Sequence, residues 1–227
     1  MEHYRNIRGT LFDLKRIKRK FAASMAKIFF ISNASNQSGK STTAFNLALC
    51  FATLGQETLL IDKEKSSWIK QLLKVEDGFL LNKITPLLSY TASIDVYINN
   101  FDVVVVDTSL MNLSAAFLVL QGQSKLLIPV EAEYYGMNLL KSFLESILEL
   151  DLEIGGFIPV MLRKSSPSSM TLIQELKKNF GNLVFEPGIQ RNFYLARQKD
   201  FDRFIASELT EKAGITYLNL ANSLLEN

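Results

Sequence analysis

The residues best suited to chemistry follow an apolar run at positions 28–31 and read Asn-Ala-Ser-Asn-Gln-Ser-Gly-Lys-Ser-Thr-Thr over positions 33–43. Small residues before a helical pattern let the N–H groups of the loop and of the first helical turn point at an anion. Lys40 adds a positive charge for the β- and γ-phosphates, and the Ser41 hydroxyl can ligate Mg²⁺. The segment therefore predicts a nucleotide-phosphate loop, formed by Gln37, Ser38, Gly39, Lys40, Ser41 and Thr42.

The phosphate-loop pattern has glycine at its first position, where this chain has Ala34. A simpler interpretation of the same residues is a Gly-Lys-Ser turn at the start of a helix. Two later segments favour the nucleotide interpretation. Residues 57–62 and 101–108 are apolar runs that end in Asp62 and Asp107, and Glu64 follows the first of them.

Continuous β-branched runs of this kind are typical of strands that are buried on both faces of a parallel sheet. A carboxylate at the end of such a strand lies beside the phosphate loop, where Mg²⁺ needs a counter-charge. Asp107 is therefore predicted, with Ser41, to hold the metal. A carboxylate after a strand can also be an ordinary helix cap, but the order of the three elements favours ATP and Mg²⁺ binding.

The composition is that of one globular domain. The chain has 227 residues, 48% of them hydrophobic, which is enough for a sizeable α/β core. Cys50 is the only cysteine and His3 the only histidine, so neither a disulfide nor a triad of serine, histidine and aspartate can form within the chain. No apolar stretch has transmembrane length and no secretory signal is evident, so we expect a cytoplasmic protein.

The charge is distributed unevenly along the chain. Residues 1–27 carry eight basic and two acidic side chains, for a net charge of +6, whereas the remainder is at −4. An apolar stripe with helical spacing runs through this basic segment, at Ile7, Leu11, Leu14, Ile17 and Phe21. We define residues 1–26 as a basic amphipathic N-terminal arm and residues 27–227 as the ATPase domain. The arm could bind an anionic membrane, nucleic acid or a partner, or pack its stripe on its own domain.

Strands and helices alternate along the domain. This βα repetition implies right-handed crossovers and an α/β fold with a mostly parallel, twisted sheet flanked by helices. Residues 66–99 are weakly patterned, with a helix suggested near Trp68. Strands are predicted at residues 28–31, 57–62, 101–108, 125–130, 156–162 and 183–185, and further helices at residues 41–54, 112–120, 136–150, 168–179 and 207–225.

Four segments resemble the ParA/Soj/MinD class of deviant Walker ATPases. They are residues 27–64, the strand that ends in Asp107, the Leu-Ile-Pro-Val-Glu-Ala-Glu-Tyr-Tyr segment at 127–135 and the Phe-Gly-Asn-Leu-Val-Phe segment that begins at 180. The resemblance covers about 200 residues. It implies a P-loop NTPase of the SIMIBI type that dimerises on ATP, binds DNA nonspecifically and positions DNA or other cargo with a ParB-like adaptor.

The resemblance also implies roles for single residues. Asp62 supports the loop lysine and the metal shell, and Glu64 stands where the family has the aspartate that orients the attacking water. Lys40, Asp62 and Glu64 are thus the catalytic candidates, and Arg163 and Arg191 join the nucleotide-binding set. Glutamate is one methylene longer than aspartate, so we expect slow, partner-stimulated ATP hydrolysis.

The loop also departs from the family. ParA-type loops carry a signature lysine that reaches the nucleotide of the other subunit, and alignment on Lys40 puts Ser35 in that place. Some carboxysome-positioning relatives are similar in lacking the loop lysine. Lys141, on the helix predicted after Tyr135, is a candidate substitute, although a solvent-facing lysine is its simpler interpretation.

A late basic cluster provides candidate contacts to DNA phosphates. It consists of Arg191, Arg197, Lys199 and Arg203. Such contacts are independent of base sequence and weaken steeply with salt. The alternative is ordinary surface charge. DNA binding would associate the protein with the nucleoid, whereas membrane contact through the arm is the less favoured partner interaction.

Two other functions remain open from the sequence. The Glu2-x-x-Arg5-x-x-Arg8 pattern resembles capsule-type bacterial tyrosine kinases, but the last eleven residues contain a single tyrosine, Tyr217. The segment Ser35-Asn36-Gln37 departs from the loop pattern of the family. A nucleotide-binding module with little hydrolysis is therefore the second open function.

Overall fold

The computed structural model describes residues 26–35, 38–64, 67–75, 81–94, 98–120, 123–132, 136–163, 166–191 and 212–226. Of the arm, only Ala26 lies within these ranges. The boundary between arm and domain therefore stays a prediction. Ala26 is buried, and the first strand follows it directly.

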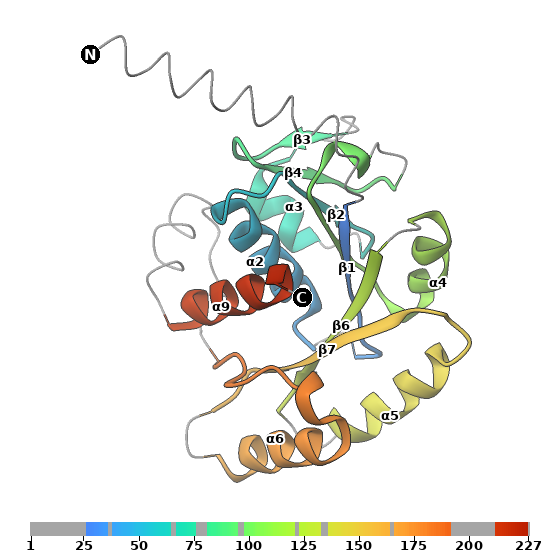
Figure 1. Cartoon of the computed structure of the whole chain (residues 1–227), viewed down its shortest axis with the longest axis vertical. Coiled ribbons are helices and arrows are strands. Elements are labelled where there is room, and N and C mark those ends of the chain that lie inside the picture. Colours follow the sequence, from blue (N-terminus) through green and yellow to red (C-terminus); the bar gives the residue numbers. More distant parts are fainter. Residues whose placement is uncertain are drawn as a thin grey trace.

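Seven strands form one sheet in the order β3-β4-β2-β5-β1-β6-β7 (Figure 1). Among these described strands, β3 alone runs antiparallel to its neighbour, which confirms the predicted α/β fold with a mostly parallel sheet. The strands are β1 (Lys27–Ile31), β2 (Thr58–Asp62), β3 (Asn82–Lys83), β4 (Leu88–Thr91), β5 (Val103–Asp107), β6 (Gln123–Glu131) and β7 (Glu153–Val160).

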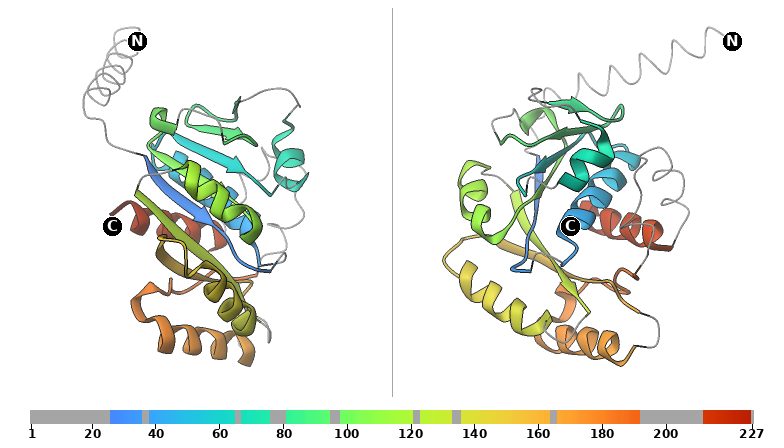
Figure 2. Two further views of the ribbon diagram at one scale, coloured as in Figure 1. Left: turned by 90° about the vertical axis from the view of Figure 1, so that its right-hand side faces the viewer. Right: turned by 180° about the vertical axis from the view of Figure 1, so that it is seen from behind.

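Helices cover both faces of the sheet and give three layers (Figures 1 and 2). One hydrophobic core lies under α2 (Lys40–Thr53), α3 (Ser67–Leu73) and α9 (Lys212–Glu226). The other lies under α4 (Leu110–Val119), α5 (Gly136–Ile147) and α6 (Pro167–Phe180). Two short 3-10 helices, η1 (Ile98–Asn100) and η2 (Gly181–Leu183), lie in connections.

The central strands supply side chains to both cores, which explains their unbroken apolar sequence. In β1, Phe29 and Ile31 belong to the core under α2, while Ile28 and Phe30 belong to the core under α4. Successive side chains of a strand point to opposite faces, so a strand covered on both sides needs apolar residues at every position.

The helix after the loop, α2, ends at Thr53, shortly before Gly55, the residue that the sequence predicted to terminate it. Gly55 has φ +86, and its N–H donates to the carbonyl of Ala52, while the N–H of Gln56 donates to the carbonyl of Phe51. These two bonds satisfy carbonyl groups that the end of a helix leaves without partners. The positive φ explains why glycine stands there.

Three parts of the sequence prediction differ from the structure. The strand predicted at residues 183–185 is wrong, because η2 ends at Leu183 and Val184 makes only an isolated bridge to Phe157. Strands β3 and β4 were missed, since their short segments carry no apolar run. The helix predicted at residues 136–150 ends at Ile147, and β7 begins at Glu153 instead of Gly156. No helix in the described part of the chain is long and apolar enough to cross a membrane.

Candidate functional site

The phosphate loop, Asp62 and Asp107 lie at the carboxyl edge of the sheet. Ile31, at the end of β1, pairs in register with Asp107, and Asp107 pairs with Asp62 on its other side. Because β1, β2 and β5 are parallel neighbours, the phosphate loop and both acidic strand ends leave the sheet at one edge. Ligands of open α/β sheets bind outside this edge, beside a point where the strand order changes direction.

Gly39 forms the transition from the loop to α2. Its φ of +76 lies in the left-handed region, which glycine adopts without a Cβ penalty. A Cβ at this position would be 3.5 Å from Met161 Cε and from Val160 Cγ2, so conformation rather than crowding requires glycine. Among the described residues no side chain caps the start of α2, which leaves the N–H groups of its first turn suited to an anion.

Lys40 is 4% exposed, and its Nζ donates a hydrogen bond to the Ser35 carbonyl at 2.6 Å. Burial lowers the pKa of Lys40 from its ordinary value, while the negative charges of Glu64 and Asp107 oppose this effect. The Lys40 side chain thus points back toward Ser35, near the start of the loop. A triphosphate held there would give the ammonium group an anionic partner.

Asp107 is completely buried, and neither of its carboxylate oxygens has a hydrogen bond of good geometry to the described part of the chain. Burial raises the pKa of Asp107 to about 7, with further increases from Asp62 and Glu64, while the Ser41 hydroxyl and Lys40 lower it. A buried carboxylate with unpartnered oxygens is costly unless a cation or donor reaches it. These oxygens, next to the Ser41 hydroxyl, fit a hydrated Mg²⁺.

The two other acidic residues differ in their surroundings. Asp62 is 1% exposed, and the Tyr90 hydroxyl donates to its Oδ2 at 3.2 Å. Glu64 is half-buried, and its buried Oε1 has no hydrogen-bond partner among the described residues. Within the described ranges, no group of three or more His, Cys, Asp or Glu side chains is arranged to bind a metal ion. Any Mg²⁺ here would therefore take ligands from phosphate and water as well as from protein, as this ion usually does.

Local hydrogen bonds hold the start of the loop. The Asn33 amide donates to the Pro129 carbonyl at 2.5 Å, which ties the loop to β6. The Ser35 N–H donates to Asn33 Oδ1 at 3.3 Å, and the Ser38 hydroxyl donates to the Ser35 carbonyl at 2.9 Å. The Ser35 carbonyl therefore accepts bonds from both Ser38 and Lys40.

Arg163 and Arg191 lie on neighbouring segments beyond the end of β7. Leu162 forms a parallel bridge with Gln190, and the Arg191 N–H donates to the Leu162 carbonyl at 2.8 Å. Both arginines are exposed. The fold thus brings together two candidates that are 28 positions apart in the sequence.

The remaining candidates are only partly covered by the structure. Ser41 and Thr42 lie in the first turn of α2 and are half-buried. Gln37, Arg197, Lys199 and Arg203 lie outside the described residues. Lys141 lies on α5 with its side chain 79% exposed, 4.0 Å from Glu145.

Sequence reasoning missed two tyrosines that support the site. Tyr90, on β4, holds Asp62, and the Tyr217 hydroxyl lies 3.1 Å from Thr43 Oγ1. The second contact links α9 to the first turns of α2 in a fully buried position. Neither tyrosine stands in a recognisable motif, and both contacts join segments that are remote in the sequence.

No protein-family model matches the chain. The sporulation initiation inhibitor protein Soj of Bacillus subtilis is 23% identical over 256 residues, which cover 89% of this chain and 100% of that protein. The chromosome-partitioning ATPase Soj of Thermus thermophilus is 25% identical over 233 residues, with 86% and 94% covered. Among solved structures, an ATP complex of McdA from Cyanothece has a TM-score of 0.72 at 19% identity, with 89% of this chain and 97% of that chain covered.

The fold and the sequence relatives agree with the geometry of the site. The ordered set of phosphate loop, Asp62 and Asp107 lies at one sheet edge, as in P-loop proteins. The Soj relatives match nearly the whole chain rather than the loop alone. The chain therefore has the fold of ParA/MinD-type P-loop NTPases and is similar to the Soj proteins over nearly its whole length.

Proposed function

We propose that this protein is a partitioning or positioning ATPase that binds Mg²⁺·ATP at the carboxyl edge of its sheet and hydrolyses it slowly. The observation that carries the proposal is the buried Asp107 carboxylate, which lies near the Ser41 hydroxyl and Lys40 and has no hydrogen bond of good geometry to the described residues. Its nearness to the start of α2, which no side chain of the described residues caps, supports a magnesium-bound phosphate as the occupant.

Each residue of the site would contribute a defined interaction. Lys40 would exchange its bond to the Ser35 carbonyl for contacts with the β- and γ-phosphates. Ser41 would ligate the metal directly, and Asp107 would hold it through water. Bound Mg²⁺ neutralises charge on the transferring phosphoryl group.

Hydrolysis would depend on the position of one water molecule. The buried Oε1 of Glu64 has no hydrogen-bond partner in the described part of the chain, and it is suited to accept a hydrogen bond from the attacking water. Asp62, which Tyr90 holds by a hydrogen bond, would keep the acidic strand ends in register. Phosphoryl transfer depends mainly on placement and charge, so the longer Glu64 side chain supports slow turnover without a partner.

The family relationship supports dimerisation on ATP, an adaptor protein and nonspecific binding to DNA as further parts of the function. Arg163 and Arg191, adjacent and exposed, are suited to contact phosphates of a nucleotide or of DNA. A filter-binding titration with duplex DNA tests this part. ATP-dependent retention that weakens with salt is expected, and its absence would remove coating of the nucleoid from the proposal.

The central experiment measures binding and hydrolysis of ATP, with and without duplex DNA, alongside the oligomeric mass. Lys40→Ala should abolish binding of Mg²⁺·ATP in calorimetry. Lys178→Ala is the matched control, because Lys178 is an exposed lysine on α6, away from the site. If Lys40→Ala binds Mg²⁺·ATP as tightly as the parent, the proposed site is wrong.

The tyrosine kinase alternative is disfavoured by the position of its candidate substrate. Tyr217 is 1% exposed and lies on α9 against Thr43, so its hydroxyl is not available to an active site in another subunit without opening the core. The alternative of a binding module with little hydrolysis predicts tight ATP binding without release of phosphate. The hydrolysis measurement therefore separates it from the ATPase.

A further inference from the structure

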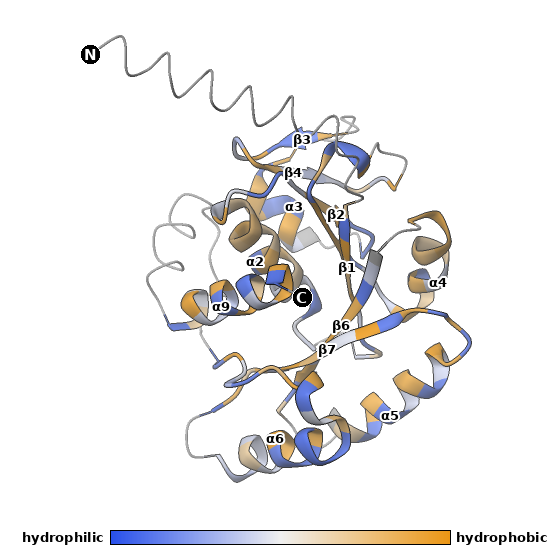
Figure 3. Cartoon of the chain, in the orientation of Figure 1, coloured by the Kyte–Doolittle hydropathy of each residue, from blue (hydrophilic) through white to orange (hydrophobic). Residues whose placement is uncertain are grey.

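Apolar side chains are exposed on the face of the molecule that α4 and α5 cover. Leu118 and Val119, in the last turn of α4, are 69% and 56% exposed, and Leu148, just after α5, is 79% exposed. Figure 3 shows the hydrophobic colouring of α4. Because α4 and α5 both run back from the carboxyl edge of the sheet, these exposed aliphatic side chains all lie at its amino edge.

These residues lie along the amino edge of the sheet, opposite the nucleotide site. α4 runs from the end of β5 back to the start of β6, so its last turn lies where β1 and β6 begin. Lys27, the first residue of β1, is in register with Gln123, the first residue of β6. Ala26 belongs to the same buried core as Ala116 and Leu120. Ala26, the last residue of the arm, therefore lies at the same edge of the sheet as the last turn of α4.

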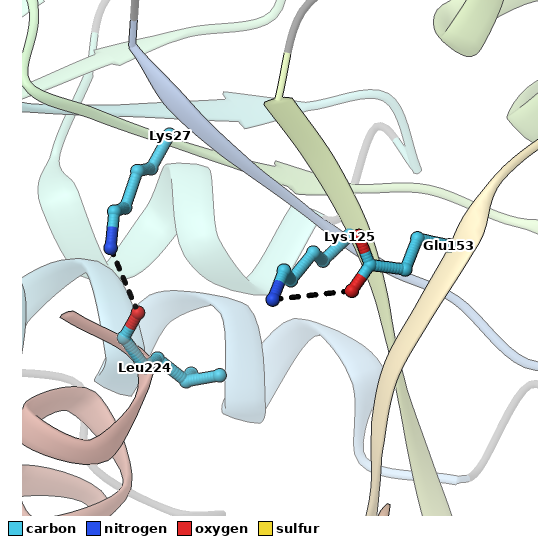
Figure 4. A network of polar contacts seen from close by, with 4 residues as sticks. All are labelled: Lys27, Lys125, Glu153 and Leu224. Atoms are coloured by element: carbon cyan, nitrogen blue, oxygen red, sulfur yellow. Dashed lines mark hydrogen bonds and ion pairs between the residues drawn. The ribbon is translucent and has the colours of Figure 1, made fainter. Parts of the chain in front are cut away.

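Acidic side chains border this surface. Glu149 and Asp151, between α5 and β7, and Glu153, the first residue of β7, are exposed. Lys125 pairs with Glu153 at 3.2 Å, but that glutamate keeps 64% of its side chain exposed (Figure 4). Register places Glu153 two strands and two residues from Lys27, about 12 Å away by ordinary strand spacings.

The arm has the matching chemistry. It carries seven basic side chains, and its apolar stripe from Ile7 to Phe21 would extend about 21 Å as a helix. The four residues between Phe21 and Ala26 can span about 14 Å when extended, which is enough to reach both α4 and the acidic segment. An occupant that is apolar on one side and basic on the other fits a surface that is apolar and bordered by acids.

We propose that the N-terminal arm of the same chain docks on this amino-edge surface, which consists of Leu118, Val119, Leu148, Glu149, Asp151 and Glu153. Its apolar stripe packs on the leucines and the valine, and its basic residues lie near the three acids. Docking of the arm covers the exposed leucines and the valine. Duplex DNA is a polyanion and would leave these aliphatic side chains exposed. The inference does not depend on the proposed function, because it concerns the edge of the sheet opposite the nucleotide.

Limited proteolysis of the full chain tests the surface. Trypsin cleaves after Lys and Arg, which are abundant in the arm, and docking should protect these sites. The double variant L118S/V119S should be cut within the arm about tenfold faster than the parent, because the docked state is lost. The matched control is Met111→Ser, since Met111 is 92% exposed on the same helix but lies at its other end. Equal cleavage of parent and double variant overturns the proposal.

Carbodiimide cross-linking identifies the occupant. At low protein concentration, without DNA or lipid, arm lysines should couple to Glu149 or Asp151 within single chains of monomer mass, and L118S/V119S should lose these links. Links found only between two copies show that a second chain occupies the surface and overturn the proposal. Links that appear only after addition of anionic phospholipid vesicles or duplex DNA also overturn it. Thermal unfolding of each variant checks that the domain still folds.

Discussion

Asp62 and Asp107 are register partners at the ends of adjacent parallel strands, and both side chains are buried. Their proximity contributes to the raised pKa of Asp107, although burial is the larger cause. In the protein without nucleotide, two acids thus lie side by side with one buried lysine near them. Two neighbouring carboxylates favour the binding of a cation, and the lysine favours the binding of a polyphosphate.

The stability of the nucleotide-free protein should depend on Asp107 and on pH. Its pKa is about 7 when folded, against about 3.9 when unfolded, so the folded state binds more protons between these values. This contribution to stability is complete below about pH 4 and is lost as pH rises through about 7. Asp107→Asn should therefore raise the free energy of unfolding relative to the parent more at pH 8 than at pH 4, by on the order of 1–4 kcal/mol.

Urea denaturation at the two pH values, without nucleotide or magnesium, checks this expectation. The same variant should lose affinity for Mg²⁺·ATP at pH 8, because Asp107 of the parent is ionised at this pH and asparagine has no charge. Stabilisation that is independent of pH would contradict the assignment of the titration to Asp107.

Glu64→Ala should trap the ATP-bound form. The variant keeps Lys40, Ser41 and Asp107 for binding but loses the carboxylate that would orient water, so hydrolysis should fall by about 10²–10⁴-fold. Phosphate release and nucleotide affinity, measured together, check the prediction. Glu175→Ala, an exposed change on α6, is the control, and hydrolysis by Glu64→Ala at the parental rate would remove Glu64 from the mechanism.

Thr43 and Tyr217 should be energetically coupled. Their hydroxyls are 3.1 Å apart in a buried position, so Tyr217→Phe or Thr43→Val should each lower the free energy of unfolding by about 1 kcal/mol. The double variant should cost less than the sum of the two changes. Thr216→Ala serves as the control, because its hydroxyl bonds within the exposed face of α9, and additive effects of the buried pair would contradict the coupling.

Lys141 is the candidate that would replace the missing signature lysine. Lys141→Ala should abolish ATP-dependent dimerisation in light scattering while leaving stability nearly unchanged, since its exposed pair with Glu145 contributes little. Glu145→Ala breaks the same pair and retains Lys141, so it should dimerise like the parent. Dimerisation of Lys141→Ala at parental levels would discard the role of this lysine.

Much of the candidate site could be predicted from local sequence. The turn at Gly39 needs a left-handed conformation, and the apolar runs before Asp62 and Asp107 need two covered faces, so both leave patterns that can be recognised in a short window. Strands β3 and β4 could not be found in this way. They are short, and β4 holds a serine and a threonine in buried positions that only its neighbours stabilise.

The sequence by itself determined the phosphate loop, the acidic strand ends and the basic arm, because each depends on residue types at fixed spacing along the chain. The tertiary structure alone decided that Asp62 and Asp107 are register partners, that Tyr90 and Tyr217 support the site and that Arg163 adjoins Arg191. It also placed the exposed end of α4 at the same sheet edge as the first residue of β1. Register and packing bring together residues that are far apart in the sequence, and the spacing of residues within a short window does not predict those contacts.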